Sequence, residues 1–289
     1  MKYGRLCPLL ALWLVACAHH PAHHDGVTDA ARRDDTNAPQ SRRYAQNQDG
    51  SPVAADIERI DRLPMPEPKS EPRSRYGNKS PYTVLGHTYR VLPTARGYHE
   101  RGIASWYGTK FHGHLTSSFE PYDMYRFTAA HKTLPLPSWA RVTNLDNGKS
   151  VIVRINDRGP FHDNRLIDLS YAAAVRLDIW RQGTGLVDVE AIDPAAVGEL
   201  PPPPVVDATH AKARLFLQVG AFADADNAER LAARLRAMQV GAVKVVRVEL
   251  GGRPLMRVRL GPLDSIDAAD ALTNRIQQQG LPQAQAVVE

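Results

Sequence analysis

Between residues 81 and 195, apolar and polar side chains alternate along several short runs of the chain. A period of two places successive side chains on opposite faces of a β-strand. Asn147 and Gly148 lie between two such runs and predict a tight hairpin in which both turn residues take positive φ. Short strands separated by turns favour a small, largely β domain closed into a barrel. The predicted strands cover 103–107, 139–145, 149–155 and 186–192.

The last part of the chain, from 212 to 289, contains two copies of one strand and helix pattern. Ala228, Leu231 and Leu235 of the first copy correspond to Ala269, Leu272 and Ile276 of the second. Two adjacent glycines, at 251 and 252, predict the hairpin between the copies. The order β-α-β-β-α-β predicts a ferredoxin-like domain, a four-stranded sheet with both helices on one face.

Capping residues mark the start of each predicted helix, because their side chains accept hydrogen bonds from free backbone N–H groups. The expected caps are Ser170 or Asp168 for a helix over 171–177, Asp226 with Glu229 for the first repeat helix, and Ser265 for the second.

The first residues resemble an export signal, since two basic residues precede a short apolar run. Residues 1–16 are the predicted signal peptide, and Cys17 is the predicted lipidation site and membrane anchor. The alternative is ordinary cleavage near Ala16 or Ala18. By resemblance to bacterial lipoproteins, Ala18 after the cysteine implies transfer to the outer membrane.

Two polar, proline-containing segments divide the rest of the chain. Residues 17–80 contain few large apolar side chains, which predicts a disordered tether. Four histidines at 19, 20, 23 and 24 lie in this tail and are expected to be solvated rather than to bind metal. A proline-rich linker over 196–211 separates the barrel domain, 81–195, from the repeat domain, 212–289.

The net charge of +5 permits binding to an anionic polymer. Because the chain is predicted to be exported, that polymer is cell-wall glycan or lipid, and nucleic acid is excluded.

Two acidic residues of the barrel domain are candidates for glycan cleavage. Asp157 follows a strand and precedes a Gly-Pro turn, and Glu120 lies in the loop 113–125. Glycan cleavage uses one carboxyl as proton donor and often a second carboxylate nearby. Without further information, the simpler interpretation of Asp157 is a turn residue beside Arg158.

Five ordered motifs of the barrel domain together resemble the rare lipoprotein A family of septal-ring lytic transglycosylases. They are IASWYG at 103–108, TAAH at 128–131, VTNL at 142–145, NDRGPF at 156–161 and IDLS at 167–170. The repeat domain, with LQVGAF at 217–222 and RVRLGP at 257–262, is similar to the sporulation-related (SPOR) repeat of that family. The resemblance implies a six-stranded double-psi β-barrel followed by a domain that binds glycan stripped of peptides.

The same resemblance implies an endolytic lytic transglycosylase without metal or organic cofactor. Asp157 is the implied catalytic acid, Glu120 the second carboxylate and His131 a partner or a core residue. The products would end in 1,6-anhydro-N-acetylmuramic acid. Phe119 departs from the family, which has Gly before the glutamate; if that position needs positive φ, Phe costs about 1 to 2 kcal/mol there. Arg158 would lower the pKa of Asp157 unless it faces away.

The period of two in the repeat domain predicts that one sheet face is open. It would carry the glycan-binding residues Phe216, Gln218, Arg257 and Arg259. The alternative is a solvated face, or a nucleic-acid-binding sheet whose aromatic motif this chain lacks.

The expected location is the periplasmic side of the envelope, at the division septum. The expected substrate is peptidoglycan strands, and other septal cell-wall proteins are possible partners. Two other functions stay open: a glycan-binding lipoprotein without catalysis, and an expansin-like barrel that loosens glycan without cleaving it.

Overall fold

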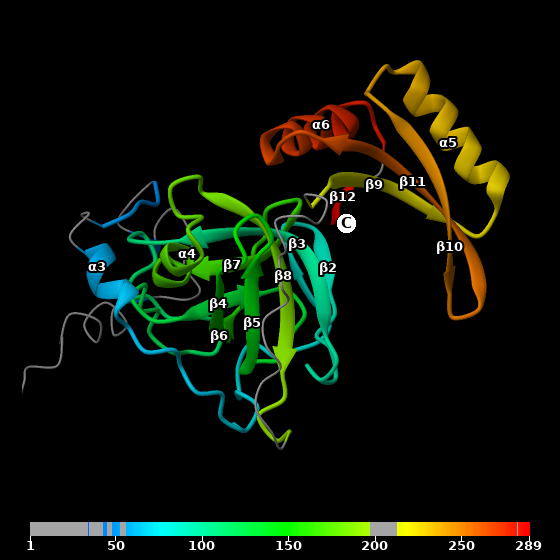
Figure 1. Ribbon diagram of the computed structural model, residues 1–289. Helices are drawn as coiled ribbons and strands as arrows, with labels where there is room; N and C mark the ends of the chain where they lie inside the picture. Colours follow the sequence, from blue (N-terminus) through cyan, green and yellow to red (C-terminus); the bar gives the residue numbers. More distant parts are fainter. Residues whose placement is uncertain (1–33, 35–42, 45–47, 53–55, 197–212, 282) are drawn as a thin grey trace, which may run out of the picture.

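The computed structural model describes residues 34, 43–44, 48–52, 56–196, 213–281 and 283–289, which form a barrel and a smaller sheet covered by helices (Figure 1). The predicted signal peptide, Cys17, the four histidines and nearly all of the proline linker lie outside these residues. In the described part, no helix is both long and apolar enough to cross a membrane.

The barrel closes through six strands in the order β3-β7-β4-β6-β5-β8. Two neighbouring pairs are parallel, β3 with β7 and β4 with β6, and the other pairs are antiparallel. The predicted six-stranded barrel is confirmed. Its strands are β3 (His99–Tyr107), β4 (Thr128–His131), β5 (Ser138–Asn144), β6 (Ser150–Asp157), β7 (Arg165–Ser170) and β8 (Thr184–Ile192).

Helix α4 (Tyr171–Leu177) covers the barrel core at the end of β7. Its cap is Ser170, whose side chain accepts a hydrogen bond from the backbone N–H of Ala173. The alternative cap, Asp168, does not have this role. Four consecutive side chains of the helix are small or β-branched and buried, so the helix lies close to the strands: Ala172, Ala173, Ala174 and Val175.

The hairpin between β5 and β6 differs from the predicted turn. Gly148 has a φ of 72°, but Asn147 does not share the positive φ expected for both residues. The amide Nδ2 of Asn147 instead donates to the carbonyl of Leu177 at 3.1 Å, and its Oδ1 accepts from Lys149. These side-chain bonds fix the turn in a form that the Asn-Gly rule does not include.

Part of the predicted tether packs on the barrel. Helix α3 (Asp56–Asp61) buries Ile60 completely, and the guanidinium of Arg176 donates to the carbonyls of Ile60 and Leu63. A two-stranded hairpin, β1 (Tyr82–Val84) with β2 (His87–Tyr89), follows. From 56 on, the chain therefore differs from a disordered tether, because a few well-spaced apolar residues suffice to hold it.

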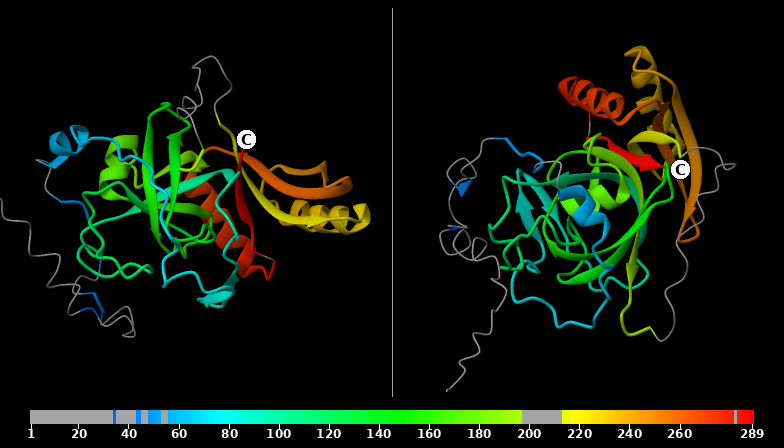
Figure 2. Two further views of the ribbon diagram at one scale, coloured as in Figure 1. Left: turned by 90° about the horizontal axis from the view of Figure 1, so that it is seen from below. Right: turned by 60° about the vertical axis from the view of Figure 1, so that its left-hand side comes forward.

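The repeat domain has the predicted β-α-β-β-α-β order, with both helices on one face of a sheet ordered β10-β11-β9-β12 (Figure 2). Gly251 and Gly252 form the hairpin turn with φ of 59° and 75°, as predicted. Ser265 caps the second helix as expected, but the cap of the first is Asp224, not Asp226. The elements are β9 (Leu215–Phe222), α5 (Ala225–Ala237), β10 (Val243–Leu250), β11 (Arg253–Leu263), α6 (Ile266–Gln278) and β12 (Gln285–Val288).

The two domains contact each other where β12 lies beside β3 (Figure 1). The guanidinium of Arg165 forms an ion pair with Asp270 of α6 at 2.6 Å, and the amide of Asn164 also donates to Asp270. Ile103 and Leu186 of the barrel pack on the apolar core of the repeat domain. The contact combines an ion pair with apolar packing.

Candidate active site

A cleft of about 710 Å³ opens beside the end of β6 and contains two carboxyls, Asp157 and Asp168. Its position follows from the register around β4. Ala130 of β4 pairs with Asp157 on one side and with Asp168 on the other. Residues directly opposite each other in a sheet share a face, so the two carboxyls lie on the same face with only a methyl group between them.

A register shift between β4 and β6 turns Asp157 toward this face. The preceding row, Ile155, Ala129 and Leu169, is completely buried in the barrel core. The register then shifts, because Ala130 pairs with Asp157 rather than with Asn156. Such irregularities re-aim side chains next to active sites.

Asp157 is partly buried at the end of β6. Its Oδ1 accepts three hydrogen bonds, from the backbone N–H and hydroxyl of Ser117 at 2.7 and 2.6 Å and from the backbone N–H of Arg158 at 2.7 Å. Burial raises the pKa of this carboxyl, and the three hydrogen bonds act in the opposite direction. Among the described residues no group donates to Oδ2, which is left to exchange a proton.

The guanidinium of Arg158 points away from Asp157, which is one of the two orientations that the sequence left open. It donates to the backbone carbonyls of Gly77 at 2.8 Å and of His131 at 3.0 Å. No ion pair joins it to Asp157 in the described part of the chain. The neighbouring cation therefore does not form the contact that would hold Asp157 ionised.

Asp168 is the site residue that sequence reasoning missed. Burial raises its pKa to about 7, the negative charges of Asp49 and Asp157 add to the rise, and a hydrogen bond with Ser105 opposes it. Its Oδ1 is out of contact with solvent and has no hydrogen-bond partner among the described residues. One feature of the sequence could have identified it. Asp168 is an acidic residue between two apolar residues, Ile167 and Leu169, in a strand whose side chains alternate between its two faces.

Glu120 lies in the loop that also contains Ser117, the hydrogen-bond donor to Asp157. Its carboxylate forms a two-pronged ion pair with Arg154, at 2.6 and 3.0 Å, and accepts from Asn156 at 3.1 Å. Burial raises its pKa, but the hydrogen bonds from Arg154 and Asn156 outweigh this and leave the pKa below its usual value. Glu120 lines a separate cleft of about 790 Å³, with Trp139 and Tyr125, so the structure does not bring it into the cleft of Asp157.

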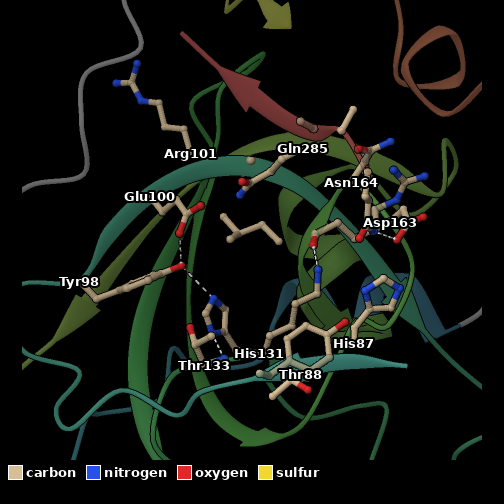
Figure 3. Close-up of a pocket in the computed structure, with 18 residues that line it drawn as sticks. His87, Thr88, Tyr98, Glu100, Arg101, His131, Thr133, Asp163, Asn164 and Gln285 are labelled. Atoms are coloured by element: carbon tan, nitrogen blue, oxygen red, sulfur yellow. Dashed lines mark hydrogen bonds between the residues drawn. The ribbon is translucent and has the colours of Figure 1, made fainter. Parts of the chain in front are cut away.

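His131 lines a third cavity, of about 410 Å³, at the junction of the two domains (Figure 3). Its Nδ1 accepts from the backbone N–H groups of Thr133 and Leu134, and its Nε2 is 2.9 Å from the hydroxyl of Tyr98. That hydroxyl donates to Glu100. Burial lowers the pKa of His131 to about 3, so the ring is neutral and acts as a fixed link between strands.

The four predicted glycan-binding residues of the repeat domain lie on β9 and β11. Arg259 pairs in register with Gln218, which shows that the two share a face. Phe216 and Arg259 are only 4% exposed, because the cations of Arg214 and Lys244 cover the ring and Glu289 pairs with Arg259. Part of the expected open face is thus covered by the chain's own charged side chains.

No cluster of three or more His, Cys, Asp or Glu side chains in the described residues has the arrangement of a metal site.

Two family models match the chain, one described as lytic transglycolase over residues 99–190 and one described as SPOR domain over residues 211–287. A Pseudomonas aeruginosa protein (strain UCBPP-PA14), the endolytic peptidoglycan transglycosylase RlpA, is 42% identical over 293 residues, covering 82% of this chain and 83% of that protein. The protein of the same name from Vibrio cholerae is 53% identical over 151 residues, covering 52% of this chain and 56% of its own length.

Among solved structures, the crystal structure of the RlpA SPOR domain from Pseudomonas aeruginosa is 40% identical. It covers 25% of this chain and 96% of that one, with a TM-score of 0.25.

Proposed function

The chain belongs to the RlpA family of endolytic peptidoglycan transglycosylases, and from this we propose that its barrel cleaves peptidoglycan glycan strands with Asp157 and Asp168 as one acid–base pair. The observation that carries the assignment is that the two carboxyls flank Ala130 in one cleft. Two carboxyls that share a site cannot both ionise freely, so the pair keeps one proton near neutral pH.

In this mechanism Asp157 protonates the oxygen between N-acetylmuramic acid and N-acetylglucosamine, and the bond from that oxygen to C1 breaks. The resulting carboxylate then removes the proton from the C6 hydroxyl of the same muramic acid. O6 attacks C1 and closes the 1,6-anhydro ring. The net change transfers one proton from O6 to the leaving oxygen and uses no water, metal or cofactor.

The hydrogen bonds divide the roles within the pair. Three donors on Oδ1 of Asp157 stabilise its anion after proton transfer, while Oδ2 carries the proton. Asp168, whose pKa burial raises to about 7, is the second carboxyl of the cleft and shares this one proton with Asp157. The negative charge of Asp157 adds to the raised pKa of Asp168, so removal of Asp157 should change the titration of Asp168.

Glu120 and His131 take supporting roles in this proposal. Glu120 fixes Asn156, the residue before Asp157, and so holds the end of β6 in place. The backbone carbonyl of His131 accepts from Arg158 and keeps that cation away from the acid.

The repeat domain binds peptidoglycan in this proposal, with Gln218 and Arg257 contacting strands that lack stem peptides. Phe216 and Arg259, which the chain's own charged side chains cover, support this face from beneath. Such strands are found at the division septum, where we place the protein. Cys17 anchors it by lipid to the outer membrane, so that the barrel faces the cell wall.

Digestion of peptide-free glycan, followed by mass analysis of the products, tests the function. Fragments ending in 1,6-anhydro-N-acetylmuramic acid are expected from the wild type and not from Asp157→Asn. Reducing ends would instead make the protein a hydrolase. The second candidate is a glycan-binding lipoprotein without catalysis, which the separation of Glu120 from the acid cleft favours; a folded wild type that yields no products would support it.

A further inference from the structure

Two exposed aromatic rings stack on each other at the edge of the acid cleft. The rings of Tyr76 and Phe119 have centroids 4.2 Å apart and an interplanar angle of 29°. Tyr76 is 45% and Phe119 47% exposed, although large apolar side chains are normally covered. Phe119 itself lines the cleft that contains Asp157.

The backbone holds Phe119 in a conformation that costs free energy. Its φ is 64°, in the left-handed region that a side chain of this size rarely adopts. The loop enforces it, since Phe119 N–H donates to the carbonyl of Thr116 at 2.9 Å and Thr116 N–H donates to the carbonyl of Glu120 at 2.8 Å. Strain of this kind collects at functional sites.

A second residue repeats the combination. Leu85, at the tip of the β1–β2 hairpin, is 78% exposed, has a φ of 50° and lines the same cleft. Two apolar side chains are thus held out toward solvent at one cleft, each with positive φ. Core packing does not account for either of them, since neither is buried.

We propose that the stacked rings of Tyr76 and Phe119 form a platform that binds the pyranose ring of a glycan sugar next to the cleaved bond. This inference rests on the proposed function of the cleft. A pyranose ring has an apolar C–H face and polar edges, so it binds where an aromatic surface adjoins hydrogen-bonding groups. The platform supplies the aromatic surface, and the cleft supplies the hydrogen-bonding groups.

The platform and the acid belong to one loop. Ser117, two residues before Phe119, donates two hydrogen bonds to Asp157. Gly77, beside Tyr76, approaches so closely that an added Cβ would lie 2.7 Å from the carbonyl of Ser117. A sugar on the platform therefore has a fixed position relative to the acid, which is what a positioning subsite requires.

Steady-state kinetics of the full chain on peptide-free glycan provide the first test. Phe119→Gly should lower kcat/KM about ten-fold, mainly through KM, because uniform binding is lost while the acid is unchanged. Tyr76→Ala should have a similar effect, and Phe119→Tyr should retain wild-type kinetics. Leu250→Ala, an apolar residue 64% exposed on β10, is the matched control and should have no effect. Wild-type KM in both Phe119→Gly and Tyr76→Ala would overturn the platform.

A second measurement does not need turnover. The full chain with Asp157→Asn, labelled with fluorophenylalanine, gives resonances for its six Phe residues, and the one lost in Phe119→Tyr belongs to Phe119. A peptide-free octasaccharide should shift that resonance. Products without this shift would overturn the platform alone, whereas the shift without products from the wild type would overturn the proposed cleavage and leave the platform standing.

Discussion

Asp157 and Asp168 come from strands on opposite sides of β4, yet both are register partners of Ala130. The strands of a sheet are about 4.8 Å apart, so the two backbones are separated by roughly twice this spacing and the side chains converge above one small residue. A larger side chain at 130 would fill the space between the carboxyls. The space between the two carboxyls thus depends on the small side chain of Ala130.

Replacing either acid of the pair by Asn should separate their roles. Asp157→Asn cannot donate a proton and should lose about 10²- to 10⁴-fold or more in turnover. Asp168→Asn should keep turnover at low pH and lose it near neutrality, because Asp157 then titrates without its partner. A pH profile of turnover measures both. Equal loss in the two variants at every pH would show that both carboxyls are required alike and would contradict this division of roles.

The contribution of Asp168 to the stability of the fold should fall with rising pH. Its folded pKa of about 7 lies above the ordinary Asp value of 3.8, so the folded state binds more protons than the unfolded state between these limits. Asp168→Asn should remove this dependence on pH. Its free energy of unfolding should exceed that of the wild type by the largest amount at about pH 8. Denaturant unfolding at each pH provides the comparison. His131, with its lowered pKa, has the opposite slope in acid and is common to both proteins.

Two substitutions at Phe119 should differ in stability although both remove the ring. Phe119→Ala loses the stacking and keeps a side chain at positive φ, whereas Phe119→Gly loses the stacking and relieves the strain. We expect Phe119→Gly to have the higher free energy of unfolding, by about 1 kcal/mol. Chemical denaturation decides the order, and equal values would mean that the loop relaxes around Ala.

The affinity of the repeat domain for glycan should fall when Gln218 and Arg257 are both changed to Ala. Two lost hydrogen-bonding side chains predict a drop in affinity on the order of 10- to 100-fold. Sedimentation with peptide-free glycan measures it, using the full chain with Asp157→Asn so that the ligand stays intact. Arg236→Ala, on α5, is the control. Unchanged affinity of the double variant would move the binding surface elsewhere on the domain.

Cys17→Ser should abolish lipid attachment, since the lipid is attached through the thiol sulfur, which Ser lacks. Labelled palmitate should appear in the wild type and be absent from the variant, which should be released from the membrane fraction or left uncleaved. A wild type without label would contradict the predicted anchor.

The strands β3, β5, β6 and β8 were predictable from their strand-like runs of residues, whereas β4 and β7 were not. The period of two, together with Asn147 and Gly148, predicts β5 and β6 because the partner of each strand follows at once. β4 has four residues, two of them Ala, and β7 pairs in parallel with distant β3. Neither has a neighbouring turn that would reveal its partner.

The same limit applies to the site. Asp168 stands just before α4 and so resembles a helix cap, whereas its register with Ala130 places it in the same cleft as Asp157. Glu120 and Asp157 are brought to different clefts by the register shift at Asn156, which no local pattern announces. Sequence motifs identify candidate site residues. Which of these residues share a cleft depends on pairing between strands that are far apart in the sequence.

The loop from Leu115 to Pro121, closed by a β-bridge between these two residues, contains the hydrogen-bond donor to the acid, the exposed ring and the carboxylate that binds Arg154. The bridge holds the two ends of the loop together, and the residues between them line two clefts. The loop can therefore be replaced as one unit. A graft of the same length would alter sugar preference while leaving the barrel untouched. An insertion of one residue would instead break the alignment of all three groups together.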